Sequence, residues 1–338
     1  MASEPRERAK RANIYDVAKL AGVSHQTVSR VLNGHVSIRP ATKARVEAAA
    51  KELDYQPSMA ARALVTKNTK MLGFLVGDTS LFGPAGWLNA LERQARLSGY
   101  YAITIALKND SPDSWADPIE HLRRLGVEGV VCIAIKRGAV ELVAAAYPNT
   151  PIVGVDTEDV AGVDTVGIDN YAGARLATDH LIELGHKSIL HIAGPADSIE
   201  ATARLEGYSD SMTAAGLKPN VIRGDWSSAT GFRLGVGLNL ELDKITAIFT
   251  ANDHLALGLM KALRLRNIEM PGQVSIVGFD DMPEAPYFEP SLTTVIQEFN
   301  VIGEAAMENL INRLTGKKSP KLEPTVPHLV VRESTRRI

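Results

Sequence analysis

Residues 14–33 read IYDVAKLAGVSHQTVSRVLN, and this stretch decides the fold of the N-terminal part of the chain. Apolar residues in its first half recur at the spacing of one helical face: Ile14, Val17, Ala18 and Ala21. Gly22 suits the left-handed backbone that ends such a helix, and Ser24 offers a side-chain oxygen to cap the next one. The pattern predicts a helix-turn-helix, although an ordinary two-helix hairpin has the same pattern.

A third helix is expected after Pro40, which suits a first helical turn, and its apolar side is formed by Val46, Ala49, Ala50 and Leu53. We call residues 14–56 the head. Residues 1–70 hold 13 basic and 6 acidic side chains, whereas residues 71–338 carry a net charge of −9. A basic N-terminal part on an acidic body is typical of a polyanion-binding unit, although a solvated basic tail would have the same charge.

Residues 14–33 resemble the DNA-binding head of the lactose/galactose repressor family, and the resemblance continues through residues 39–46 and 53–58 to residues 331–334. Residues 60–64 are similar to the hinge helix of that family. A helix of this length is marginal in water, so we expect it to order only when DNA binds and two copies pack together. The resemblance implies that Ala61 and Leu64 contact DNA, with Leu64 as an apolar wedge in the minor groove. Packing of Leu64 on the body is the alternative.

The first turns of a recognition helix face the major groove, which assigns base edges to His25, Gln26, Ser29 and Arg30. Glutamine pairs bidentately with adenine and arginine with guanine. Phosphate contacts set the register without reading sequence, and they are expected from Tyr15, Ser24, Thr27 and Asn33. The expected partner is therefore double-stranded DNA, as a palindromic operator bound by a homodimer.

We call the chain from Met71 onward the body. In the body, short apolar runs alternate with amphipathic helical segments, and this alternation predicts βαβ units in a parallel sheet. Strands are expected at residues 71–76, 100–107, 129–135, 151–155, 188–193, 221–223, 247–250, 274–279 and 292–296. The fold class is an all-α helix-turn-helix head plus an α/β body with two doubly wound parallel-sheet lobes, of periplasmic-binding-protein type by resemblance. The expected domains are a flexible tail (1–13), the head (14–56), a hinge and linker (57–70), lobe 1 (about 71–168 and 299–326) and lobe 2 (about 169–298 and 327–338). By resemblance, a helix at 301–315 returns to lobe 1 and a strand at 328–331 returns to lobe 2.

Polar residues follow several of these strands, and ligands of open α/β sheets bind at the carboxyl ends of strands. Carboxylates, amides and an arginine fork suit sugar hydroxyls, and an indole suits an apolar sugar face. The resemblance implies effector contacts by Arg204, Trp226, Asn252 and Asp280. Asp156, which follows the strand at 151–155, is expected at the same site because it stands at a strand end. A core indole at Trp226 and solvated acids at Asp280 and Asp281 are the alternatives. The expected function is a repressor of carbohydrate-utilisation genes released by a mono- or disaccharide; the same fold could instead respond to a purine or a protein co-repressor.

Other classes of function find little support in the sequence. Cys132, the only cysteine, sits in an apolar run and is expected to be an inert buried thiol. We find no dinucleotide fingerprint, phosphate-binding loop, nucleophile elbow or metal-ligand spacing, so neither an enzyme, a cofactor nor a bound metal is expected. The sequence also lacks a signal peptide and any apolar run long enough to span a bilayer, so a cytoplasmic protein is expected.

Overall fold

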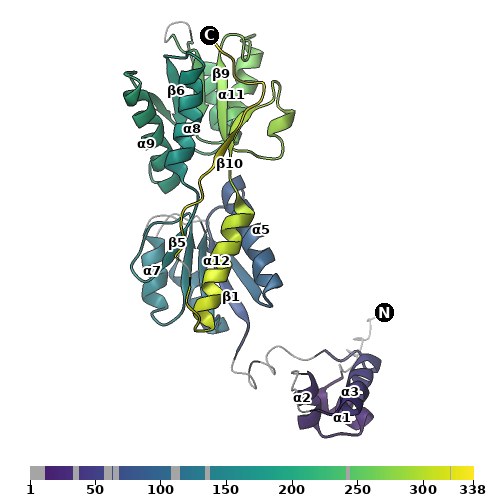
Figure 1. The fold of residues 1–338 in the computed structure, drawn as a ribbon. Coiled ribbons are helices and arrows are strands. Elements are labelled where there is room, and N and C mark those ends of the chain that lie inside the picture. The colour runs from purple at the N-terminus through teal and green to yellow at the C-terminus, as the bar shows by residue number, and fades with distance from the viewer. Residues whose placement is uncertain are drawn as a thin grey trace, which may run out of the picture. The chain divides into compact units, whose positions relative to one another are not determined.

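The computed structural model describes residues 12–32, 38–56, 63, 68–107, 115–133, 138–240, 244–319 and 321–338. The chain divides into two compact units, Met1–Lys70, which contains the head, and Met71–Ile338, which is the body (Figure 1). Asn33, Ala61 and Leu64, three of the expected DNA contacts, lie outside the described residues.

The head contains three helices: α1 (Ile14–Ala21), α2 (His25–Leu32) and α3 (Pro40–Glu52). Asn13 and Asp16 form a capping box that fixes the start of α1, and Gly22 ends it with φ of 62°. Each helix contributes to one small apolar core, in which the fully buried members are Val17, Val28 and Val46. The expected helix-turn-helix and third helix are confirmed.

Lobe 1 of the body is built on a five-stranded parallel sheet in the order β2-β1-β3-β4-β5. Its strands are β1 (Met71–Val76), β2 (Tyr101–Ala106), β3 (Gly129–Ile133), β4 (Ile152–Val155) and β5 (Asp164–Val166). Alternate residues of β1 enter two different apolar clusters, because successive side chains point to opposite faces of a sheet. Helices α5 (Phe82–Leu97) and α12 (Phe299–Leu314) cover one face, and α6 (Ala116–Leu125) and α7 (Ala139–Ala146) cover the other.

Lobe 2 contains a six-stranded sheet in the order β11-β10-β9-β8-β6-β7, parallel except for the edge strand β11. The strands are β6 (Ile189–Ala193), β7 (Asn220–Arg223), β8 (Ala247–Thr250), β9 (Ser275–Asp280), β10 (Thr293–Ile296) and β11 (His328–Val330). Helices α8 (Asn170–Glu183) and α9 (Ile199–Ala214) pack together on one face, and α10 (Ser228–Gly237) and α11 (Asp253–Leu265) on the other. A short 3-10 helix, η2 (Ala285–Tyr287), follows β9.

Helices α10 and α11 approach each other closely at two glycines. A Cβ atom on Gly258 would lie 1.8 Å from the carbonyl oxygen of Ser228, and one on Gly231 would lie 2.2 Å from that of Leu255. Only glycine therefore allows these backbones to meet. Asn252 caps α11, and Trp226 lies two residues before α10, so the close approach also brings these two residues together.

The chain passes between the lobes three times (Figure 1). The passage from β5 to α8 and the return from α12 to β11 run side by side, because Asp169 N donates to Thr325 O at 3.0 Å and Thr325 N to Gly167 O at 2.9 Å. The other passage, from β10 to α12, contains Gln297. Helix α12 packs on α5 and β11 pairs with β10, so the expected returns to lobe 1 and lobe 2 are both confirmed.

The expected elements differ from the observed ones in a few places. Strand β5 was not expected, and Asp280 is the last residue of β9 rather than the first after it. Cys132 is fully buried, and burial raises the pKa of its thiol to about 12, which confirms the inert buried thiol. Within the described ranges, we see no helix long and apolar enough to cross a membrane.

Candidate functional site

The recognition helix of the head presents an exposed polar side. His25, Gln26 and Arg30 are exposed on α2, and Ser29 is half-buried on the same helix. Tyr15 is 64% exposed, and its ring centroid lies 5.1 Å from that of His25, so α1 and α2 share one aromatic surface patch.

Ser24 has a local structural partner in the head. Its Oγ accepts a hydrogen bond from Thr27 N at 3.2 Å and lies 3.0 Å from Thr27 Oγ1. This is the cap expected at the start of α2, and it fixes the position of both hydroxyls. Both residues keep enough exposure to meet a phosphate at the N-terminus of the helix, where the helix dipole favours an anion.

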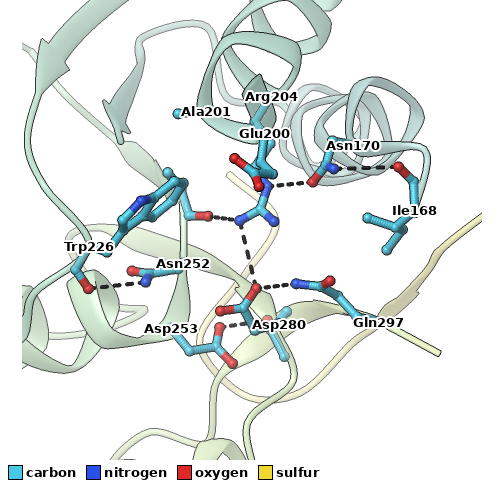
Figure 2. A network of polar contacts seen from close by, with 12 residues as sticks. Ile168, Asn170, Glu200, Ala201, Arg204, Trp226, Asn252, Asp253, Asp280 and Gln297 are labelled. Atoms are coloured by element: carbon cyan, nitrogen blue, oxygen red, sulfur yellow. Dashed lines mark hydrogen bonds and ion pairs between the residues drawn. The ribbon is translucent and has the colours of Figure 1, made fainter. Parts of the chain in front are cut away.

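Arg204 is the centre of a buried polar network in lobe 2 (Figure 2). It extends from α9, and its Nε donates to Asn170 Oδ1 at 2.8 Å. Its Nη1 donates to the carbonyl oxygen of Ala251 and lies 3.6 Å from Asp280 Oδ1. The guanidinium carbon lies 3.6 Å from the centroid of the Phe279 ring, so the side chain is held in place on every side.

Asp280 ends β9 with φ of 119°, a backbone conformation that L-residues rarely adopt. Gln297 Nε2 donates to its Oδ1 at 2.5 Å, so the amide of Gln297 lies against the carboxylate (Figure 2). Burial raises the pKa of Asp280 to about 6, and the attraction of Arg204 offsets only part of this effect. The neighbouring Asp281 points elsewhere and accepts from Arg332 Nη2 at 2.7 Å, so it is neither a solvated loop acid nor part of the cluster.

Trp226 and Asn252 complete the lobe 2 side of the cluster. Asn252 caps α11 through its Oδ1 and donates from Nδ2 to the carbonyl oxygen of Trp226 at 3.1 Å. The half-buried indole rests against Gly194, where an added Cβ would lie 2.7 Å from it. The Arg204 guanidinium lies 5.5 Å from the indole centroid, so Trp226 both packs on the lobe 2 core and borders the polar network.

Asp156 approaches the cluster from lobe 1, at the end of β4. It lies close enough to Arg204 and Glu200 to interact with both electrostatically. Its carboxyl oxygens accept from Trp87 Nε1 at 2.9 Å and from Ile168 N at 3.2 Å. Burial raises the pKa of Asp156 to about 7, with a contribution from the negative charge of Glu200. Residue 156 therefore connects helix α5, strand β4 and the first passage between the lobes.

Two family models match this chain: bacterial regulatory proteins of the lacI family over residues 13–58, and a periplasmic binding protein-like domain over residues 178–335. The lactose operon repressor of Escherichia coli (strain K12) is 31% identical over 330 residues, 96% of this chain and 91% of that protein. The chain belongs to the lacI family. As a member, it is a DNA-binding transcriptional regulator, as the sequence predicted.

Other lacI-family proteins match over the full length. The HTH-type transcriptional repressor PurR of Haemophilus influenzae (strain PittEE) is 32% identical over 97% of this chain and 99% of that protein. The crystal structure of the Lac repressor dimer bound to operator and the anti-inducer ONPF superimposes with a TM-score of 0.89 at 30% identity. That match covers 97% of this chain and 100% of the other. The expected combination of a helix-turn-helix head and two α/β lobes is thereby confirmed for this lacI-family chain.

Several residues of the cluster in this lacI-family regulator were missed by the sequence reasoning. They are Trp87, Asn170, Glu200 and Gln297. Gln297 directly follows β10, so the rule that ligands bind at strand ends would have found it. Glu200 lies four residues before Arg204 on the same helix, and this spacing puts both on one face. For Trp87 and Asn170 the sequence offers no comparable signal, because helical spacing alone does not distinguish them from packing residues.

Proposed function

We propose that this regulator represses carbohydrate-utilisation genes, binds a palindromic operator as a homodimer, and leaves the operator when a sugar binds between the two lobes. The observation that carries the proposal is the buried cluster of Arg204, Asp280, Asn252 and Trp226 at the carboxyl ends of the lobe 2 strands. Asp156 approaches it from lobe 1, so one ligand could contact both lobes.

The chemistry of the cluster suits a polyhydroxylated ligand. Arg204 and Asn252 supply N–H donors, Asp280 and Asp156 supply acceptors, and each sugar hydroxyl can use one of each. The half-buried indole of Trp226 offers an apolar surface for the C–H face of a pyranose. The relatives support the same reading, since one of them is named for the lactose operon.

A titration of the operator complex with a panel of sugars tests this proposal. We expect at least one mono- or disaccharide to dissociate the complex in a mobility-shift assay. A ligand can act this way only through its different affinities for the operator-bound and free conformations. A panel without any releasing sugar would refute the proposal, and a purine that tightens operator binding would establish the co-repressor alternative.

In the head, we assign base contacts to His25, Gln26, Ser29 and Arg30, and phosphate contacts to Tyr15, Ser24 and Thr27. We expect Arg30→Ala to cost about 1–3 kcal/mol on the specific operator, because a bidentate arginine–guanine contact is worth that much. Binding to random DNA should weaken far less, since phosphate contacts dominate there. Fluorescence anisotropy on both DNAs measures the two losses. Equal losses on specific and random DNA would contradict base reading by Arg30.

We expect the chain to be a dimer in solution. Two half-sites of a palindrome match the two-fold symmetry of a dimer, and the related Lac repressor structure is a dimer on its operator. Multi-angle light scattering of the free protein measures the mass directly. A stable tetramer, or a monomer that binds the operator with the same affinity, would overturn this expectation.

A further inference from the structure

The effector cluster contains more acidic than basic side chains. Arg204 interacts electrostatically with four carboxyl groups: Asp156, Glu200, Asp253 and Asp280. Arg204 is also the cation that lowers the pKa of both Asp156 and Asp280. One guanidinium therefore faces four acids, and burial raises the pKa of Asp156, Asp253 and Asp280. A further positive charge would be stabilised here, because it would favour the ionised form of these acids.

Three of these acids have structural partners of their own. Asp253 accepts from Thr294 Oγ1 at 2.6 Å and from Met282 N at 2.9 Å, and its burial raises its pKa well above the ordinary value. Asp156 accepts from Trp87 and Ile168, and Asp280 accepts from Gln297. Glu200 differs, because in the described part of the chain it accepts a single hydrogen bond, from Ser198 Oγ at 2.5 Å. It is half-buried in the first turn of α9, so its carboxylate retains acceptor sites for a ligand.

A second acceptor belongs to Gln297, which is only 6% exposed. Its Nε2 must face the Asp280 carboxylate, because an ionised carboxylate only accepts hydrogen bonds. The other end of the amide, Oε1, is buried and has no partner among the described residues. Figure 2 shows this amide beside Asp280, within the same cluster as Glu200 and Arg204. A buried carbonyl oxygen without a donor destabilises the protein, and a ligand N–H would remove this cost.

The missing donor and the missing positive charge can come from one group. A metal ion is not favoured, because no group of three or more acidic, histidine or cysteine side chains in the described ranges is placed to hold one. A protonated amine instead offers three N–H donors and one positive charge, and it does not need a closed shell of ligands. Resting on the proposed function, we infer that the effector is an amino sugar whose ammonium group binds at Glu200 and Gln297 Oε1, while its hydroxyls bind Arg204 and Asp280.

Isothermal titration calorimetry on the full chain tests this inference. Glucosamine, galactosamine and mannosamine are compared with their N-acetyl derivatives and with glucose, galactose and mannose. We expect at least one amino sugar to bind about tenfold more tightly than both its neutral counterparts, the effect of one charge-assisted hydrogen bond. Glu200→Gln keeps the shape and the acceptor for Ser198 but removes the charge, so the preference for the amine should fall to about threefold or less.

Glu206→Gln is the matched control, since it removes the same charge from the exposed side of the same helix and should retain the preference. Thermal melting of both variants checks that they are folded. If a neutral sugar binds as tightly as its amino counterpart, or if Glu200→Gln retains the preference, the inference is wrong and the proposed function stands. If none of these sugars binds, the inference is wrong, and the disaccharides of the operator-release panel decide whether the proposed function fails with it.

Discussion

Asp280→Asn is expected to give a regulator that still binds its operator and no longer leaves it when the effector is added. A hundredfold weakening of operator binding needs about 2.7 kcal/mol of coupling between the two sites. A hydrogen bond to a charged group contributes about 1.5–3 kcal/mol, so the loss of one is enough to remove most of the response. Asparagine retains an acceptor for Gln297 and nearly the same volume, so the lobe should stay folded. Operator release by the active sugar, followed by anisotropy, measures the effect.

The same experiment on Arg204 needs a different substitution from alanine. Arg204→Ala would leave Asp280 buried beside an empty space, and breaking a buried ion pair costs about 3–5 kcal/mol. Arg204→Met also breaks this ion pair, but its apolar stem still packs against Phe279 and leaves less empty space, so it should cost less stability than alanine. Asp281→Asn is the matched control for Asp280→Asn. Because Asp281 pairs with Arg332, the Asp281→Asn variant should respond to the sugar as the wild type does. Normal release by Asp280→Asn would remove Asp280 from the effector site.

The stabilising effect of Asp156 on the effector-free protein is expected to decline as pH rises from about 4 to about 7. The pKa of Asp156 is about 7 in the folded protein against 3.8 in the unfolded chain, so over this interval the folded state retains a proton that the unfolded state releases. The stabilisation by Asp156 is complete below the unfolded-state pKa of 3.8, and it is lost as pH rises through the folded-state pKa of about 7. Relative to Asp156→Asn, the wild type should lose about 2–4 kcal/mol of unfolding free energy across this range. Urea denaturation at several pH values measures this difference.

Comparison with the variant is essential because other groups titrate in the same range. Burial lowers the pKa of His191 to about 3, so its neutral form stabilises the fold increasingly as pH rises from about 3 to 6.5, the opposite direction. Glu200 and Arg204, which face Asp156, are present in both proteins. These contributions cancel in the difference. A difference that does not change with pH would show that Asp156 is solvated in the free protein.

Local patterns explain why the head could be predicted closely. Gly22 and Ser24 act on the backbone within three residues of themselves, so their roles can be inferred without a structure. Strand β5 was missed for the opposite reason: it has three residues, two of them half-buried, and its position depends on pairing with β4.

Long-range contacts explain what the sequence could not provide at the site. The resemblance implied effector roles for Arg204, Asn252 and Asp280, and the fold brings them together. It does not indicate that Asn170, 34 positions earlier, holds Nε of Arg204, or that Trp87, 69 positions before Asp156, donates to it. These partners come from different elements, and they meet only because α8 packs on α9 in lobe 2 and α5 packs on the lobe 1 sheet.

The three passages between the lobes also affect how the protein is made. Synthesis runs from the N-terminus, and domains usually fold as soon as their residues have emerged from the ribosome. Here the lobe 1 sheet is translated early, but α12, which covers one of its faces, ends at Leu314. Lobe 2 is completed later still, when Ser334 Oγ donates to Ile276 O and Ile338 N donates to Leu184 O. Only α5 covers this face at first, so the nascent chain exposes part of an apolar sheet face from the completion of β5 at Val166 until α12 ends at Leu314, a period in which a chaperone could bind it.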